Sequence, residues 1–247
     1  MIEQYRFAIT DERGGRILQN WSYRLYSWLM EQLPPDLADR LHEDGSHAIT
    51  QNLRFEKETR QNIWTVNLLK AETMETVRTV LQNVHSIPLH EDTLRVSPLG
   101  AAHTVTAEDL LAAGRESTSR YAVLNFVSPC AFKQAGHYTI FPQEELIFNS
   151  LVARWNETFP TYALTDEEAL QFMRQGLRIV DYTLYSTRFK LKGMWIPAFM
   201  GDITLKAGLA LPLTEIWNTL LAFAPYSGIG IKTTLGMGAA KSEYKQK

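Results

Sequence analysis

The sequence predicts an α+β protein of two tandem ferredoxin-like (RRM-like) domains with a C-terminal glycine-rich loop. The apolar patterns of the first half follow the order strand, helix, strand, strand, helix, strand, which is the ferredoxin-like order. The second half approximates the same order. The chain has 247 residues, and at about 150 residues per domain this leaves room for one large or two small domains. We place the N-terminal domain at residues 1–118 and the C-terminal domain at residues 119–247.

The first half begins with a strand over residues 4–10, where apolar and polar side chains alternate. Residues 19–32 carry apolar side chains at helical spacing, and the following Pro34 and Pro35 end that helix. A second short helix is expected to begin at Pro35 and to end near His42. The remaining elements of this half are two strands, a helix and a strand, expected over residues 49–56, 62–69, 71–84 and 92–96.

The second half follows a polar, alanine-rich stretch, in which Thr106 is a plausible helix start. A strong strand is expected over residues 121–127. Two long strands are expected to form a hairpin that turns at Lys192 and Gly193. The elements expected in this half are strands over residues 121–127, 177–190, 194–205 and 238–244, and helices over residues 142–158, 165–174 and 214–223.

The composition excludes several classes of protein. Hydrophobic residues make up 45% and charged residues 21%, which is an ordinary globular balance and not that of a disordered chain. The net charge is −2, so any nucleic-acid partner requires locally concentrated basic residues. The single cysteine, Cys130, excludes an internal disulfide and a thiolate-rich metal site. With no apolar run long enough to span a membrane, we expect a cytoplasmic protein. We also expect no metal or cofactor, because there is one cysteine and the histidines show no HxH or HExxH spacing.

The segment Gly228–Gly238 contains four glycines and follows a predicted helix. Glycine permits a close approach of the backbone, and successive amides can form a concavity that binds phosphate. Lys232, Thr233 and Thr234 add a cation and two hydroxyls. The segment is neither a Walker A loop nor a dinucleotide fingerprint, because Ile231 precedes the lysine and the order here is helix, loop, strand. A glycine-rich hairpin or bulged strand is the alternative interpretation.

Several separated pieces of the chain resemble one family. They are the C-terminal GIGIKTTLGMGAAK, the strand KGMWIPAFMGDITL over residues 192–205, the strand FVSPCAF over residues 126–132, and Leu41-His42-Glu43 after an amphipathic helix. Together they resemble the CRISPR repeat-processing endoribonucleases, the Cas-six family of the repeat-associated mysterious protein superfamily. The resemblance implies a metal-independent ribonuclease that cuts precursor RNA within each repeat. In that reaction the 2′-hydroxyl attacks the adjacent phosphate and leaves 2′,3′-cyclic phosphate and 5′-hydroxyl ends.

The resemblance also implies the catalytic residues. His42 falls at the position of the family's catalytic histidine, at a helix C-terminus where the dipole favours a positive charge. Tyr26 lies on the preceding helix, where some members carry a catalytic tyrosine. Those members have a lysine shortly after the histidine, and the residue available here is His47. We therefore expect His42 and Tyr26 to act as acid and base, in an order left open, and His47 to stabilise the phosphate or to share in proton transfer.

The residues expected to bind RNA lie in the second half. Arg188, Lys190 and Lys192 alternate along the predicted hairpin and should project from one face, with Phe189 turned to the core. Tyr182, Tyr185 and Trp195 on the same hairpin are expected in the core, with base stacking as the alternative. The glycine-rich loop supplies the other expected phosphate contacts: Gly228, Gly230, Lys232, Thr233, Gly236 and Gly238.

The expected partners are CRISPR repeat RNA as precursor and as mature guide, subunits of an effector complex, and a second copy of the chain, with no membrane partner. Two alternative functions stay open. A non-catalytic relative that holds guide RNA in an effector complex would share the fold and the loop. A small-molecule enzyme on a ferredoxin-like fold would have a ligand pocket and no salt-dependent affinity for RNA.

Overall fold

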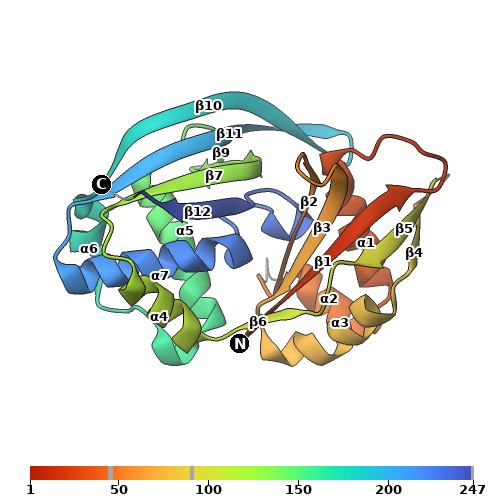
Figure 1. The fold of residues 1–247 in the computed structure, drawn as a ribbon, viewed down its shortest axis with the longest axis horizontal. Coiled ribbons are helices and arrows are strands. Elements are labelled where there is room, and N and C mark those ends of the chain that lie inside the picture. The colour runs from red at the N-terminus through yellow and green to blue at the C-terminus, as the bar shows by residue number, and fades with distance from the viewer. Residues whose placement is uncertain (44–46, 90–91, 246–247) are drawn as a thin grey trace. The chain divides into compact units, whose positions relative to one another are not determined.

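The computed structural model describes residues 1–43, 47–89 and 92–245, and the chain divides into two compact units (Figure 1). Unit 1 comprises Met1–Thr104 and Thr233–Gly236, and unit 2 comprises Val105–Lys232 and Met237–Lys247. Each unit combines helices with an antiparallel sheet, so the α+β class is confirmed. Within the described residues, no helix is both long enough and apolar enough to cross a membrane.

Unit 1 is built on the sheet order β2-β3-β1-β5-β4, and the short strand β6 also pairs with β1. The expected strands and helices of this half are present, whereas β4 and β6 were not expected. Pro88 lies within β4, which explains why the sequence does not indicate a strand there. The bounds are β1 Ile2–Asp11, η1 Gln19–Trp21, α1 Ser22–Glu31, α2 Pro35–Glu43, β2 Ile49–Glu56, β3 Gln61–Leu68, α3 Ala71–Asn83, β4 Ser86–Leu89, β5 Asp92–Pro98 and β6 His103–Val105.

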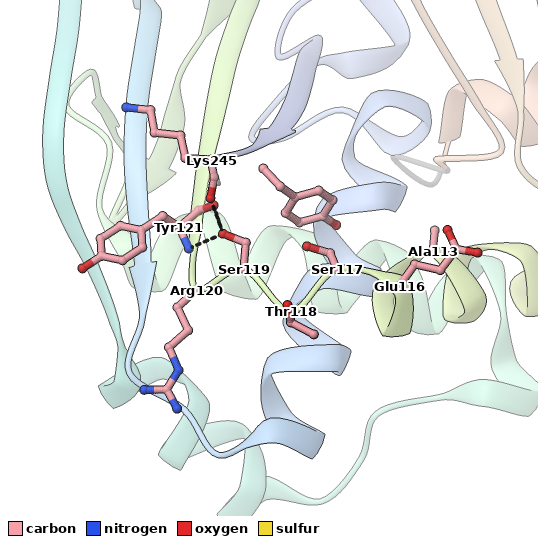
Figure 2. A pocket seen from close by; sticks show the side chains of 9 residues that line it. Ala113, Glu116, Ser117, Thr118, Ser119, Arg120, Tyr121 and Lys245 are labelled. Carbon is pink, nitrogen blue, oxygen red and sulfur yellow. Dashed lines mark hydrogen bonds between the residues drawn. The ribbon is translucent and has the colours of Figure 1, made fainter. Parts of the chain in front are cut away.

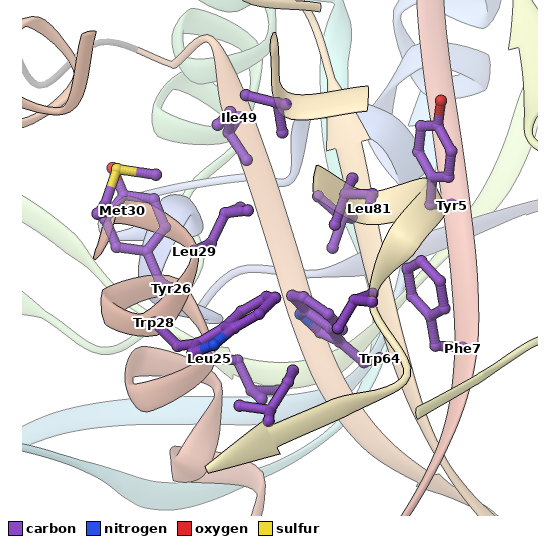
Figure 3. Packing of buried hydrophobic residues seen from close by; sticks show 14 of the residues in the cluster. Tyr5, Phe7, Leu25, Tyr26, Trp28, Leu29, Met30, Ile49, Trp64 and Leu81 are labelled. Atoms are coloured by element: carbon purple, nitrogen blue, oxygen red, sulfur yellow. The ribbon is translucent and has the colours of Figure 1, made fainter. Parts of the chain in front are cut away.

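The core of unit 1 lies between its sheet and its helices. Phe7 of β1 lies opposite Trp64 of β3 in the strand register, and their ring centroids are 5.4 Å apart. Trp28 of α1 meets the edge of the same Trp64 ring, with the centroids 6.4 Å apart (Figure 3). Leu81 from α3 is buried in the same cluster. This apolar contact fixes α1 against the sheet, and α1 is the helix that carries Tyr26.

Unit 2 is built on the sheet order β10-β11-β7-β12, with β8 and β9 as a separate small hairpin. The expected strands and helices of this half are present, and the β8–β9 hairpin was not expected. The bounds are α4 Ala107–Glu116, β7 Tyr121–Cys130, β8 Phe132–Gln134, β9 His137–Thr139, α5 Glu144–Thr158, η2 Pro160–Tyr162, α6 Glu167–Gly176, β10 Leu177–Leu191, β11 Met194–Ala207, α7 Leu211–Ser227 and β12 Ala240–Tyr244, with the 3-10 turn η3 Thr233–Leu235 counted in unit 1.

The helix α4 begins where the sequence indicates. The Thr106 hydroxyl accepts a hydrogen bond from the Asp109 amide, and the Asp109 carboxylate accepts one from the Thr106 amide, which is a capping box. Gly114 of α4 lies so close to α7 that an added Cβ would overlap the Thr219 side chain. Because α4 packs on α7, it belongs to unit 2, and the division of the chain falls between Thr104 and Val105, ahead of the division after residue 118 that the sequence led us to place.

The two sheets share one pattern of strand pairing. In unit 1, β2 pairs with β3, β3 with β1, and β1 with β5. In unit 2, β10 pairs with β11, β11 with β7, and β7 with β12. Each sheet therefore has its first strand, counted along the chain, between the later strands of its unit.

Candidate functional site

Two of the expected catalytic residues lie together in unit 1. Tyr26 comes from α1 and His42 from the last turn of α2, and their ring centroids are 6.0 Å apart in an edge-on arrangement. The segment 32–34, which ends in Pro34, separates the two helices, and α2 begins at Pro35 and packs on α1. Leu37 and Leu41 of α2 are both buried in the core of unit 1, and this burial fixes the helix face from which His42 projects.

The two side chains have different surroundings. Tyr26 is only 4% exposed and lies in the apolar cluster beside Leu29 and Met30 (Figure 3). Burial raises the pKa of Tyr26 to about 12, because the phenolate is poorly solvated there. His42 is exposed to solvent. The pair therefore combines a phenol that stays protonated at neutral pH with an imidazole that solvent and substrate can reach.

His47, the third expected catalytic residue, is half-buried directly ahead of β2. The residues that join it to α2 at positions 44–46 lie outside the described part of the chain. Its catalytic role stays a prediction.

The unit 2 part of the glycine-rich loop uses its amides within the chain. The amide of Gly228 donates to Ala224 O at 2.9 Å, that of Gly230 to Ser150 Oγ at 2.9 Å, and that of Gly238 to Pro129 O at 2.8 Å. In this conformation all three amides donate to acceptors within the chain, so they are not available to bind a phosphate. The three glycines have positive φ, which explains why the sequence requires glycine there.

A buried arginine supports the same part of the loop. Arg154 of α5 is 3% exposed, and its guanidinium donates to Ser227 O at 3.1 Å and to Gly230 O at 2.6 Å. Burial lowers the pKa of Arg154 to about 10. The thiol of Cys130 is fully buried beside the loop and donates to Ile229 O at 3.4 Å, and burial raises its pKa.

Lys232 is the one exposed residue between Gly228 and Ala240. Its φ of 55° lies in the left-handed region, which is uncommon for a residue with a side chain. The next residue, Thr233, is buried at 2% exposure, so its hydroxyl is turned away from solvent. Of the loop residues expected to meet phosphate, Lys232 has the most accessible side chain.

The unit 1 part of the loop, Thr233–Gly236, packs against the first residue of α1. The Ser22 hydroxyl donates to Leu235 O at 2.8 Å. Gly236 has a φ of 103°, and a Cβ added there would overlap the Ser22 side chain. Glycine at this position is therefore explained by a close approach to the protein's own helix.

The hairpin of unit 2 presents its basic residues to solvent. Arg188, Lys190 and Lys192 are exposed, whereas Phe189 is 1% exposed, as the alternation predicts. The expectation that Tyr182, Tyr185 and Trp195 lie in the core is wrong. Their exposed fractions are 57%, 56% and 57%. Tyr182 and Tyr185 lie on β10, an edge strand of the sheet, and Trp195 lies on β11 near the hairpin tip.

Lys190 and Trp195 form a cross-strand pair near the tip of the hairpin. They are register partners, and the Lys190 ammonium lies 5.7 Å from the centroid of the Trp195 ring. This cation–π contact places a positive charge beside an exposed aromatic face. The combination can meet both a phosphate and a base of single-stranded nucleic acid.

Unit 2 also contains an open cavity of about 770 Å³ along the segment that joins α4 to β7. Ser119 lines this cavity, and its hydroxyl accepts from the Tyr121 amide at 3.1 Å and donates to Lys245 O at 2.6 Å (Figure 2). None of the expected site residues lines this cavity. Within residues 1–43, 47–89 and 92–245, no three His, Cys, Asp or Glu side chains gather as a metal site would require.

Sequence reasoning missed the buried polar residues that support the loop. Arg154 gives a usable signal, because a charged residue falls between Val152 and Trp155 at a helix position that should face the core. Gln51 of β2, whose side-chain amide donates to Thr234 O in the loop, gives no such signal. An isolated glutamine in a strand is equally typical of a solvent-facing position.

A sequence model of the CRISPR-associated endoribonuclease Cas6 matches residues 124–240. A CRISPR-associated endoribonuclease Cas6 from Streptococcus thermophilus is 29% identical over 98% of this chain and 99% of its own length. One from Mycobacterium tuberculosis is 26% identical over 88% of this chain and 70% of its own length.

Solved structures show the same fold. A Cas6 product complex superposes with a TM-score of 0.80 at 23% identity, covering 98% of this chain and 100% of that one. A Thermus thermophilus Cas6 superposes with a TM-score of 0.75 at 22% identity, covering 98% of each chain. In sequence, this chain is therefore similar to the Cas6 family of CRISPR-associated endoribonucleases, over residues 124–240 for the family model and along almost the whole chain for the Streptococcus thermophilus relative.

Proposed function

We propose that this protein cuts CRISPR precursor RNA within its repeats without a metal ion, using Tyr26 and His42. The observation that carries the proposal is the pair itself, a buried phenol and an exposed imidazole with ring centroids 6.0 Å apart. Similarity to the Cas6 endoribonucleases supports the class of reaction, and the pair supplies two groups that can exchange protons.

The proposed reaction is a transesterification. A base removes the proton of a ribose 2′-hydroxyl, and the resulting oxygen attacks the adjacent phosphorus. The bond from phosphorus to the 5′-oxygen of the next nucleotide breaks, and that oxygen receives a proton from an acid. The products carry a 2′,3′-cyclic phosphate and a 5′-hydroxyl, and no water or redox partner is consumed.

The raised pKa of Tyr26 assigns the two roles in this proposal. With a pKa of about 12, the phenol is protonated at neutral pH and can donate to the leaving oxygen. His42, which is exposed and carries an imidazole that can accept a proton, then acts as the base. We propose His47 as a further cationic or proton-sharing group.

For binding, we propose that Lys232 and the hairpin residues Arg188, Lys190 and Lys192 contact phosphates. Their exposure supports this role, and Trp195 beside Lys190 supports stacking of one base. We further propose that both units are ferredoxin-like, on the strength of their shared strand pairing. The partners we propose are the repeat RNA, as precursor and as mature guide, and effector subunits that receive the product.

The test is a cleavage assay in EDTA on an end-labelled repeat RNA from the protein's own locus. A substrate with one 2′-deoxy at the cut site and the variant His42→Ala are run beside it. We expect specific cleavage that both changes abolish, and a 3′ product end that resists ligation until the cyclic phosphate is opened and the resulting phosphate is removed.

Two other outcomes would reject the proposal. Tight, salt-sensitive binding without cleavage would favour a non-catalytic relative that holds guide RNA. Cleavage that EDTA abolishes would instead require a metal, and the roles given to Tyr26 and His42 would have to be withdrawn.

A further inference from the structure

Gln51 of β2 is a buried side chain that joins three parts of unit 1. It is 2% exposed. Its Nε2 donates to Ser22 O at 2.6 Å and to Thr234 O at 3.0 Å. Its Oε1 accepts from the indole N–H of Trp64 at 2.7 Å. One amide group therefore contacts strand β3, the first residue of α1 and the glycine-rich loop.

The orientation of this amide is determined by its partners. The indole N–H of Trp64 can only donate, so the Gln51 oxygen must face it and the nitrogen must face the two carbonyls. Trp64 itself is fully buried, in contact with Phe7 and Trp28. The rigid core of unit 1 thus fixes the direction in which Gln51 donates.

The loop is tied to α1 at consecutive residues. Gln51 donates to Thr234 O, Ser22 donates to Leu235 O at 2.8 Å, and Gly236 lies against the Ser22 side chain. Tyr26 lies one helical turn after Ser22, on the same side of α1. The distance from the loop segment to the phenol is therefore set by one turn of helix.

We infer that Gln51 is a positioning residue for RNA cleavage. It holds the loop segment Thr233–Gly236 at a fixed distance from Tyr26, so that a phosphate bound by the loop is aligned with the phenol. This inference rests on the function proposed above. A misplacement of about 1 Å at a reacting group can cost about 10²-fold in rate.

The test compares Gln51→Met, which keeps the volume and removes all three hydrogen bonds, with Thr50→Val. Thr50 is the buried neighbour on β2 whose hydroxyl accepts from Asn67 at 3.0 Å and which contacts neither α1 nor the loop through that bond. We measure the single-turnover cleavage rate at saturating RNA and, separately, the Kd for an uncleavable 2′-deoxy repeat.

We expect Gln51→Met to lower the cleavage rate about 10- to 100-fold while Kd changes less than about threefold. Gln51→Glu, which keeps the acceptor for Trp64 but has no donor for the two carbonyls, should behave like Gln51→Met. Thr50→Val should leave both quantities unchanged. A cleavage rate in Gln51→Met equal to that of Thr50→Val would overturn the inference, as would a loss confined to Kd.

Amide hydrogen exchange separates this inference from the proposed function. Peptides covering residues 233–240 should exchange faster in Gln51→Met than in Thr50→Val, whether or not RNA is cut. If the unaltered protein does not cleave RNA and the exchange rates still differ, the proposed function fails and Gln51 remains a support of the loop. If the exchange rates are equal in the two variants, the positioning inference fails even in an active enzyme.

Discussion

Unit 1 and unit 2 offer different chemistry to the proposed RNA substrate. Unit 1 pairs the buried Tyr26 with the exposed His42, two groups suited to proton transfer. Unit 2 exposes a long hairpin with basic residues and Trp195, which suit binding. The Cas6 sequence model matches residues 124–240, which lie almost entirely in unit 2. The part that is easiest to recognise is therefore the part proposed to bind, and the proposed chemistry lies outside the matched residues.

The largest effect should come from unit 1. His42→Ala should lower the single-turnover cleavage rate by about 10³-fold, because proton transfer by a positioned side chain contributes about 10²- to 10⁴-fold. The affinity for an uncleavable repeat should change less than threefold. His85→Ala, which changes another exposed histidine of unit 1, is the control and should cleave normally. A weakened affinity for the uncleavable repeat with an unchanged cleavage rate would show that His42 contributes to RNA binding and not to the chemical step.

A tyrosine from each unit gives the next comparison. Burial raises the pKa of Tyr26 and of Tyr244 to about 12, above the ordinary value of 10.0. The folded protein therefore keeps these protons at a pH where the unfolded chain has released them. The stabilisation is present in full below pH 10 and is lost as pH rises toward 12. For Tyr26 it amounts to at most about 3 kcal/mol, because each pKa unit corresponds to about 1.4 kcal/mol.

Tyr26→Phe and Tyr244→Phe should each reduce this alkaline loss, as measured by urea unfolding at pH 8, 10 and 11.5. The hydroxyl of Tyr244 donates to Asn218 O at 2.8 Å, within unit 2. Only Tyr26→Phe should slow cleavage at pH 7, by about 10²-fold. Equal cleavage rates in the two variants would show that the Tyr26 hydroxyl takes no part in the reaction, although the residue is buried.

A smaller effect is expected at the hairpin of unit 2. Trp195→Ala should weaken RNA binding about 10-fold, because a base stacked on an aromatic ring contributes about 1–3 kcal/mol. The cleavage rate at saturating RNA should not change. Phe172→Ala, which removes a ring of 56% exposure on α6, is the matched control. A reduced rate with unchanged affinity in Trp195→Ala would contradict the division of labour between the units.

The smallest change concerns salt. Arg188→Gln, Lys190→Gln and Lys192→Gln should each reduce the slope of log affinity against log salt by about 1, because one phosphate contact is lost. The slope is measured by RNA-binding titrations at several salt concentrations. Lys133→Gln, at an exposed lysine of β8, should leave the slope unchanged. Identical slopes in all four variants would show that the hairpin does not contact phosphates.

Much of the fold follows from local patterns in the sequence. The alternation over β1, the proline pair before α2 and the capping box at Thr106 each depend on neighbouring residues alone, and all three are present in the structure. The strands β4, β8 and β9 were missed because each is four residues or fewer, which is too short to establish a period.

The candidate site was less predictable, because it depends on contacts between distant parts of the chain. The exposure of Tyr182, Tyr185 and Trp195 follows from the position of β10 at a sheet edge, and strand composition does not reveal this. The burial of Gln51 could not be predicted, because its neighbours Thr50 and Asn52 on β2 are buried too. The alternation of buried and exposed positions that would mark a core-facing residue is therefore absent there. The pairing of Tyr26 with His42, in contrast, was expected from the family resemblance and not from spacing.

The burial of Cys130 has a practical consequence. Its thiol is 0% exposed and burial raises its pKa, so it presents little thiolate to a maleimide reagent. As the protein has one cysteine, a new one at an exposed position can carry a fluorophore without any change to the native residue. Met194, at the turn of the hairpin with 66% exposure, is a suitable position. A dye there would report directly on the arrival and departure of RNA during a single catalytic cycle.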